Sequence, residues 1–436
     1  MIGEMWTAFG VLFALIFLRM PIGCAMLAVG LVGFAELVSW RAAFAMLGTT
    51  VFEAARSYTL SVLPLFIVMG NLLTRAGVSR ELFGAAYAVL GHRRGGLAMA
   101  TILAAGGFSA VSGSSLATAA TMAKVAMPEM RRYGYAPGFA AGAVAAGGTL
   151  GILIPPSVIM VIYGLLTQSD IGKLFIAGIL PGLLGIAMYV GAAAVATAIS
   201  RSLGPPGERH PLKERLRALR GVAPTLGPFA VIVGGIYLGV FTPTEAAGIG
   251  AMVALGMALA RRALRARELL EALVESGRTT AMLFTVIIGA LVFGNLVNVA
   301  GFPDLLREIV ERSGLGPWSV VTVIAAIYLV LGCALESLSM ILLTVPVFYP
   351  LVQVLEFGLD PDSVLIWFGI VVVVATEISL LTPPVGMNVF VLRGPLPDVS
   401  LRTIYRGVTP FWLADILRLG VILYIPSLSL ALPRLM

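Results

Sequence analysis

Charged residues are scarce in this chain. Only 12% of its 436 residues are Asp, Glu, Lys or Arg, whereas 59% are hydrophobic, and soluble globular domains contain about 25% charged residues. The scarcity excludes a soluble globule and indicates an all-α polytopic membrane protein. The first apolar run, Met5 to Leu18, lacks the basic start and small-residue cleavage site of a signal peptide, so we expect a retained helix.

Residues that serve metal and enzyme chemistry are also rare. The two cysteines, Cys24 and Cys333, lie in separate apolar segments, which indicates neither a disulfide framework nor a metal site. The sequence lacks a G-x-x-x-x-G-K-[ST] loop for nucleotide hydrolysis and a nucleophile with a recognisable base, so we expect no enzyme activity. The net charge of +7 is concentrated around the loop 201–220, which we interpret as a cytoplasmic loop and not as a nucleic-acid patch.

Apolar segments dominate the rest of the chain, and a membrane span needs about 20 residues. Two segments, 97–130 and 316–355, contain a small or polar break near the middle, with flanks that are short for a full span. We interpret each as a re-entrant helical hairpin, and an ordinary pair of spans joined by a polar turn is the alternative. The other candidate crossings lie near 5–18, 20–38, 59–76, 136–168, 174–200, 222–242, 244–261, 279–299, 363–394 and 409–431.

Basic residues orient this arrangement. With the loop 201–220 in the cytoplasm, most of the 29 Lys and Arg residues fall on the cytoplasmic side, as the positive-inside rule requires. Both termini are then predicted to be periplasmic. The first hairpin enters from the cytoplasm and the second from the opposite side.

Two proline pairs interrupt apolar segments that are rich in glycine and threonine. Pro155-Pro156 lies in the segment 136–168, and Pro383-Pro384 lies in the segment 363–394. Proline removes backbone donors, so both segments are predicted to be broken helices within the membrane. Paired broken helices in corresponding positions indicate the binding site of a transporter.

The chain contains an internal duplication that divides it into 1–220 and 221–436. Each half has five predicted crossings and one hairpin, and because five is odd, the second half is inverted relative to the first. Inverted repeats place substrate and coupling ions at the repeat interface near the midplane. The repeated anchors are Pro21 with Pro243, Gly70-Asn71-Leu72 with Gly294-Asn295-Leu296, Pro128 with Pro350, the two proline pairs, and Gly178-x-x-Pro181 with Gly407-x-x-Pro410.

Several long motifs resemble the large membrane subunit of tripartite ATP-independent periplasmic (TRAP) transporters. They include Gly107 to Ala119, Gly148 to Ser157, Phe241 to Ala247 and Leu381 to Asn388, and the resemblance covers essentially the whole chain. It implies a secondary transporter of the bacterial inner membrane, driven by a sodium gradient. It also implies a scaffold and an elevator-type transport domain that carries the hairpins.

The resemblance further implies partners. These are a small four-helix membrane subunit, a periplasmic substrate-binding protein and a carboxylate substrate, such as a C4-dicarboxylate or a sialic acid, in addition to membrane lipid. The alternative is a stand-alone ion-coupled dicarboxylate symporter of the same superfamily, which would transport without protein partners.

Oxygen-rich clusters lie at the hairpin tips and helix breaks. Sodium is a hard cation, and hard cations prefer oxygen ligands, so we predict two or more sodium sites. The alternative is that these small residues only allow close helix packing. The first predicted site comprises Ser112, Gly113, Ser114, Gly147, Gly148 and Thr149, and the second comprises Glu336, Ser337, Ser339, Thr376, Ser379 and Thr382.

Helix N-termini at the tips and breaks suit a carboxylate. The candidate substrate contacts are Ser115, Ser157, Ser339 and Asn388, with helix capping or packing as the alternative role of Asn388. A carboxylate at membrane depth is usually functional. We expect Glu336 to lie near a cation, with proton coupling as the alternative, and Glu377 either to be functional or to face a polar surface between domains.

Overall fold

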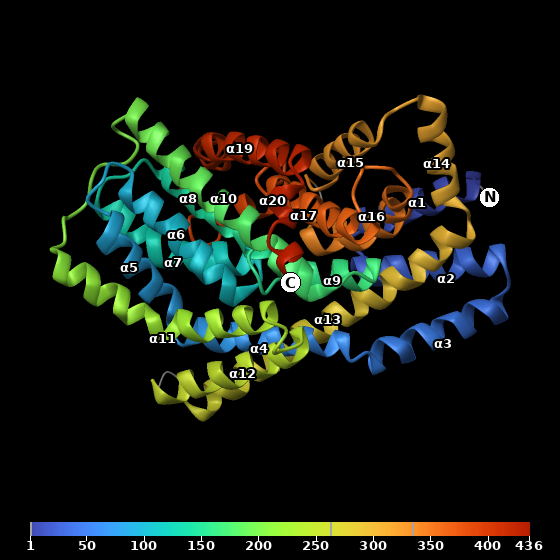
Figure 1. Ribbon diagram of the computed structural model, residues 1–436, viewed down its shortest axis with the longest axis horizontal. Helices are drawn as coiled ribbons and strands as arrows, with labels where there is room; N and C mark the ends of the chain where they lie inside the picture. The colour runs from blue at the N-terminus through green and yellow to red at the C-terminus, as the bar shows by residue number, and fades with distance from the viewer. Residues whose placement is uncertain (1, 262–263, 334) are drawn as a thin grey trace.

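The computed structural model describes residues 2–261, 264–333 and 335–436, which form helices, turns and loops without a strand (Figure 1). The all-α prediction is therefore confirmed for these residues. The helices of the first half are α1 (Ile2–Phe17), α2 (Ile22–Leu37), α3 (Trp40–Arg56), α4 (Val62–Arg75), α5 (Val78–Leu90), α6 (Gly96–Ser112), α7 (Ser115–Arg132), α8 (Pro137–Thr149), α9 (Val158–Thr167) and α10 (Ile171–Ile199).

The second half follows a similar order of elements. It begins with three long helices, continues through a short amphipathic helix and an apolar helix pair, and ends near the centre of the molecule (Figure 1). Its helices are α11 (Leu212–Tyr237), α12 (Pro243–Ala260), α13 (Ala266–Val299), α14 (Phe302–Ser313), α15 (Pro317–Leu331), α16 (Ser337–Gln353), α17 (Pro361–Ser379), α18 (Met387–Val391), α19 (Leu401–Tyr424) and α20 (Ser427–Leu430).

Helix length and composition agree with a multi-pass membrane protein. Five helices in the described part of the chain, α10, α12, α13, α17 and α19, are long and apolar enough to cross a membrane. The segments Trp40–Arg56 and Thr59–Arg75 form a further candidate span that is bent by 58°. Most of the remaining predicted crossings correspond to shorter apolar helices, such as Met5–Phe17 within α1 and Ile22–Leu37, which is α2.

The predicted cytoplasmic loop 201–220 is a loop only in its first part, because α11 already begins at Leu212. The residues from Leu212 to Arg220 are mostly Leu, Lys, Glu, Arg and Ala, which are strong helix formers. Their charge therefore lies on the first turns of a helix that continues into the apolar segment.

Both segments that were predicted to be hairpins contain two helices in contact. Helices α6 and α7 meet at Gly113, which has a φ of +60° and ends α6 in the left-handed conformation. Helices α15 and α16 meet at the segment 332–336, of which residue 334 lies outside the described residues. We call these two turns tip 1 (residues 112–115) and tip 2 (residues 332–337).

Both proline pairs lie where a helix is interrupted. Helix α8 ends at Thr149, a 3₁₀ turn covers Leu150–Ile152, and α9 begins only at Val158. In the second half α17 ends at Ser379 and the short helix α18 begins at Met387. We call residues 150–157 break 1 and residues 380–386 break 2.

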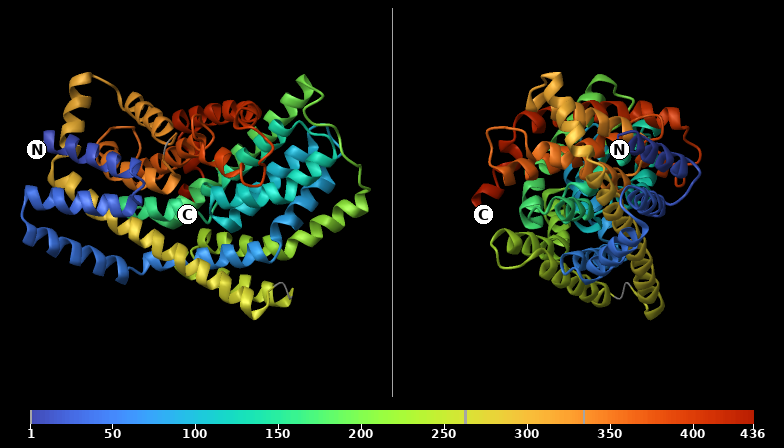
Figure 2. Two further views of the ribbon diagram at one scale, coloured as in Figure 1. Left: turned by 180° about the vertical axis from the view of Figure 1, so that it is seen from behind. Right: turned by 90° about the vertical axis from the view of Figure 1, so that its right-hand side faces the viewer.

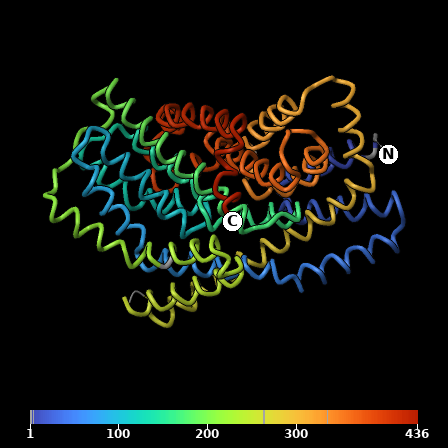
Figure 3. The backbone as a smooth tube through the Cα atoms, viewed as in Figure 1, coloured from blue at the N-terminus to red at the C-terminus, as the bar shows by residue number. Residues whose placement is uncertain are grey.

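The two halves of the chain interleave in space (Figure 3). Helix α2 packs along α13, α4 along α12, α8 along α19, and α10 against α17. At the crossing of α8 and α19, a Cβ atom at Gly407 would lie 1.8 Å from the carbonyl oxygen of Gly138, so only glycine permits this approach. Close packing through small residues is typical of helix pairs in membranes.

The helices separate into two sides of the molecule. Helices α3, α4, α11 and α12 line one side, at the bottom of Figure 1, while α15 and α19 lie on the opposite side (Figure 1). The same separation is visible when the molecule is turned (Figure 2). Tips and breaks lie between these two sides.

Candidate functional site

A polar cavity of about 350 Å³ lies where the two tips approach each other. Helices α4 and α13 close it on one side, and the start of α9 closes it on another. The fold thus brings residues from both halves of the chain to one cavity. Its polar lining residues are Asn71, Thr74, Ser112, Ser114, Ser115, Glu275, Thr279, Glu336 and Ser337.

Three helices direct their N-termini at this cavity. Helix α7 contributes Ser115, α9 contributes Val158, and α16 contributes Ser337 as lining residues. The first N–H groups of a helix have no partner within the helix and carry a partial positive charge, which suits an anion. None of the lining residues in the described part of the chain is Lys or Arg.

Two carboxylates line the same cavity. Glu275 on α13 accepts a hydrogen bond from Arg75 Nη2 at 2.9 Å, so its charge is already paired. Glu336, at the N-terminus of α16, accepts a hydrogen bond from Ser339 Oγ at 3.1 Å. The cavity therefore combines N–H groups that suit a carboxylate with oxygen atoms that suit a cation.

Tip 1 packs tightly against the first broken helix. A Cβ atom at Gly113 would lie 3.1 Å from the carbonyl oxygen of Pro156, and one at Gly148 would lie 2.6 Å from the Cβ of Ala119. Ser112 Oγ lies 2.5 Å from Thr118 Oγ1, whereas Ser114 caps α7 at the backbone of Ala117.

The structure brings only part of the predicted first ion site together. Ser112, Gly113 and Ser114 line the cavity, and Gly147 and Gly148 lie against the hairpin helices α6 and α7. The Thr149 hydroxyl is directed elsewhere, because it donates to the Ala146 carbonyl at 2.8 Å and lies 3.1 Å from the hydroxyl of Tyr189. Its side chain does not reach tip 1.

The predicted second ion site is divided in a similar way. Glu336 and Ser337 line the cavity, and Ser379 touches tip 2 at Gly332, where a Cβ atom would lie 1.9 Å from Ser379 Oγ. The hydroxyls of Thr376, in α17, and Thr382, in break 2, instead donate to carbonyls of α17 at 2.8 Å.

The four predicted substrate contacts also lie in different environments. Ser115 lines the cavity, and Ser339 is buried beside Glu336. Ser157 donates to the Ile152 carbonyl at 2.5 Å and caps α9, so it closes break 1. Asn388 donates to the Ala145 carbonyl on α8 at 3.1 Å and lies outside the cavity lining.

Four lining residues were not predicted from the sequence: Asn71 and Thr74 on α4, and Glu275 and Thr279 on α13. Asn71 belongs to the repeated Gly-Asn-Leu anchor, and this repetition could have identified Asn71 as a candidate site residue. Glu275 lies in a charged segment that precedes an apolar run. Nothing in the sequence shows that this charged segment approaches the tips.

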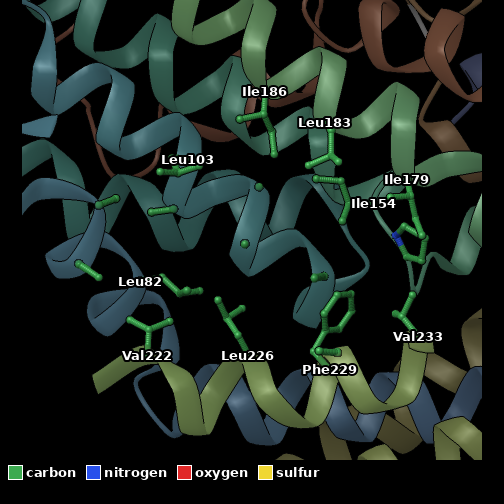
Figure 4. A pocket seen from close by; sticks show the side chains of 18 of the residues that line it. Leu82, Leu103, Ile154, Ile179, Leu183, Ile186, Val222, Leu226, Phe229 and Val233 are labelled. Atoms are coloured by element: carbon green, nitrogen blue, oxygen red, sulfur yellow. The ribbon is translucent and has the colours of Figure 1, made fainter. Parts of the chain in front are cut away.

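A second, larger cavity of about 620 Å³ lies between α5, α6, α10 and α11 (Figure 4). Figure 4 shows Leu82, Leu103, Leu226 and Phe229 directed into it. Its lining contains no charged side chain among the described residues. It offers nothing to recognise an ionic substrate, so the polar cavity between the tips remains the candidate site.

Two helix hairpins and two interrupted helices around a partly open cavity with polar lining residues define a membrane transporter of the broken-helix class. A solved structure of a transporter, YdaH of Alcanivorax borkumensis, shares this fold with a TM-score of 0.60. The match has 14% sequence identity and covers 88% of this chain and 87% of that one. At this identity it supports the fold alone.

The chain belongs to the family of tripartite ATP-independent periplasmic transporters, DctM component, whose family model matches residues 9–428. The C4-dicarboxylate TRAP transporter large permease protein DctM of Pseudomonas aeruginosa is 40% identical over 390 residues, which cover 89% of each chain. The sialic acid TRAP transporter large permease protein SiaM of Vibrio cholerae is 32% identical over 440 residues, covering 100% of this chain and 99% of that one. These relatives are transporter permeases and not enzymes.

Proposed function

We propose that this chain is the large membrane subunit of a TRAP transporter that imports an organic acid and is driven by a sodium gradient. The polar cavity carries this proposal, because it collects both tips and three helix N-termini between the two halves of the chain. Similarity to the relatives assigns the chain to the TRAP transporter family. The lining of the cavity supports an organic acid as the substrate.

The chemistry of the cavity favours a carboxylate that is bound together with cations. Helix N-termini provide N–H donors for carboxylate oxygens, and relatives are named for C4-dicarboxylates, sialic acid and 2,3-diketo-L-gulonate. Because the described lining has no Lys or Arg, a bound cation is the group that can balance the substrate charge.

Sodium fits the oxygen atoms at the tips. At tip 1 the carbonyl oxygens of Val111 and Ser112 lie at the C-terminal end of α6, close to Gly70, where a helix carries partial negative charge. At tip 2 the Glu336 carboxylate and the nearby serine hydroxyls supply further oxygen ligands. These donor sets contain oxygen only, which hard cations prefer.

The pairing of helices supports an inverted repeat. If α2, α4, α8 and α10 correspond to α12, α13, α17 and α19, then the contact of α2 with α13 has its counterpart in α4 with α12. Likewise, the contact of α8 with α19 corresponds to that of α10 with α17. Reciprocal pairing of this kind is expected when two halves are related by a pseudo-two-fold axis.

We further propose that the hairpins, breaks and the helices around them form an elevator-type transport domain that moves against a scaffold containing α2, α4, α12 and α13. The complete transporter would contain a small membrane subunit and a periplasmic substrate-binding protein in the bacterial inner membrane. Both termini of this chain would be periplasmic.

Uptake into proteoliposomes tests the proposal. The chain is reconstituted with its small subunit and loaded binding protein, and uptake of a labelled organic acid is measured with an inward sodium or potassium gradient. We expect uptake only with sodium and only with the binding protein. Equal uptake in potassium would contradict sodium coupling, and uptake without either partner would favour the stand-alone symporter.

Two hydroxyl variants address the proposed ion sites in the same assay. Ser114→Ala removes an oxygen at tip 1, and Thr382→Ala removes one at break 2. We expect each to raise the sodium concentration for half-maximal uptake, while Thr409→Ala, which removes an exposed hydroxyl of α19, leaves it unchanged. An unchanged sodium dependence in both site variants would reject these ligands.

A further inference from the structure

A cluster of ionisable side chains lies in the interior, away from the polar cavity. Glu377 comes from α17, Asp415 and Arg418 come from α19, and Tyr189 comes from α10. Their exposed fractions are 0%, 1%, 0% and 0%. None of them lines the cavity between the tips, and the function proposed above assigns them no role.

The cluster is held by direct contacts across three helices. Arg418 Nη2 forms ion pairs with Glu377 Oε2 and, at 2.8 Å, with Asp415 Oδ1. The Tyr189 hydroxyl donates to Asp415 Oδ2 and lies 3.1 Å from the hydroxyl of Thr149. Contacts therefore run from the end of α8, just before break 1, to the last turns of α17, just before break 2.

The charges in this cluster do not balance. Arginine stays protonated in proteins, and Tyr189 is a neutral donor to Asp415. Among the described residues, Arg418 faces Glu377 from α19, Asp415 lies one turn from Arg418 on the same helix, and Tyr189 faces Arg418 from α10. With both carboxyls ionised, the cluster would carry one uncompensated negative charge in an apolar interior, which is strongly unfavourable.

We propose that the cluster binds one proton, carried by Glu377, and is thereby an electrically neutral clamp between the two broken helices. Asp415 Oδ2 accepts a hydrogen bond from Tyr189, and Asp415 Oδ1 has no hydrogen bond but lies 2.8 Å from Arg418 Nη2 in an ion pair. Glu377 Oε1 has no hydrogen-bond partner among the described residues, and Arg418 approaches the other oxygen, Oε2, so Oε1 is the oxygen with room for a proton. Asp415 and Arg418 then form the ion pair.

The side chains of the clamp are shielded from solvent in this arrangement. All of its side chains are buried, and Gly185 on α10 lies directly against the guanidinium, where a Cβ atom would be 1.9 Å from Arg418 Nη1. We expect the proton to remain with the folded structure in this arrangement.

Infrared spectroscopy of the purified full chain tests the proton directly. We expect a carbonyl stretch from a protonated carboxyl group at neutral pH, shifted when the protein is labelled with carboxyl-¹³C glutamate and unshifted with labelled aspartate. Glu377→Gln should abolish the band, whereas Asp362→Asn, which removes an exposed carboxyl at the start of α17, should retain it. A band that survives Glu377→Gln, or no band in the wild type, would overturn the proposal.

Thermal unfolding of the same protein in detergent supplies a second test. Either Glu377→Gln or Asp415→Asn leaves one carboxyl to balance Arg418, so each midpoint should stay within a few degrees of the wild type. The double variant leaves Arg418 without a counter-charge and should lower the midpoint by roughly 5–10 °C. A double variant as stable as the single ones would overturn the proposal. Neither measurement involves uptake, so the result is independent of the proposed transport function.

Discussion

At the scale of single residues, the absence of a side chain at Gly185 determines how a charge is buried. The guanidinium of Arg418 lies against the backbone of Gly185 and its carbon atom lies 5.7 Å from the centre of the Tyr189 ring. Arg418 is fully buried, so it depends on this space and on its two carboxyl partners. A small residue on α10 thus permits an ion cluster between α17 and α19.

Gly185→Ala should therefore destabilise the protein. The added methyl group would displace Arg418 from its partners, and we expect a loss of about 3 kcal/mol in the free energy of unfolding. Gly191→Ala on the same helix, where a Cβ atom meets nothing within 4 Å, should be neutral or slightly stabilising. Thermal unfolding of both variants in detergent measures the difference, and equal midpoints would contradict the role of Gly185.

The sequence predicted which residue types collect at the tips and breaks, but not what each hydroxyl does. Ser157 and Ser114 serve as helix N-caps, a role that serine and threonine often have wherever a helix begins. Thr149 is directed at Tyr189 because it lies on the far face of its helix from tip 1. The direction of a side chain depends on the rotation of its helix, which the spacing of residues does not determine.

At the scale of elements, tip 1 and break 1 form one packed unit. Gly113 ends α6 with a φ of +60° and lies against the Pro156 carbonyl, while Gly151 in break 1 lies against the backbone of Ser114. The tip and the break therefore fix each other's position beside the cavity. A displacement of either one would change the arrangement of the oxygen atoms there.

Gly113→Ala should consequently reduce uptake more than stability. Alanine in the left-handed conformation costs about 1 kcal/mol, and its methyl group would in addition move tip 1 away from break 1. Gly134→Ala is the matched control, because Gly134 has a φ of +72° and open space around its Cβ position. We expect similar midpoints of thermal unfolding but about tenfold slower uptake for Gly113→Ala alone. Equal uptake by the two variants would refute the coupling of tip and break.

Breaks and hairpins were predictable because proline and glycine act on the backbone locally, independently of what surrounds them. The buried cluster was not predictable in the same way. Arg418 was visible as a basic residue inside an apolar segment, but its partner Glu377 belongs to another helix. Only the packing of α17 against α19 brings the two together.

At the scale of the whole molecule, the hairpins meet the proposed scaffold over small contact regions. Hairpin helix α16 contacts α13 near Gly294 and Pro346, where a Cβ atom built on Gly294 would lie 3.6 Å from the Cβ of Pro346. By contrast, α2 and α13 pack backbone against backbone, since a Cβ atom at Gly30 would lie 2.8 Å from the nitrogen of Phe293. An elevator movement requires the first contact to slide while the second stays fixed.

A cross-link between α13 and α16 should therefore stop transport. The Cβ separation at Gly294 and Pro346 suits a disulfide, for which about 3.8 Å is typical. The variant carries Gly294→Cys and Pro346→Cys, and its native Cys24 and Cys333 are replaced by serine. It should become cross-linked on oxidation. We expect oxidation to abolish nearly all uptake and a reductant to restore it. A matched pair within the scaffold is Gly33→Cys with Leu296→Cys, because a Cβ atom built on Gly33 would lie 3.5 Å from Cγ of Leu296. Its oxidation should leave uptake unchanged. Suppose that the α13–α16 cross-link forms fully and uptake is as fast as in the uncross-linked protein. Helices α13 and α16 then do not move relative to each other during transport. Substrate must in that case cross by a local opening of the tips, in a transport domain that stays in place.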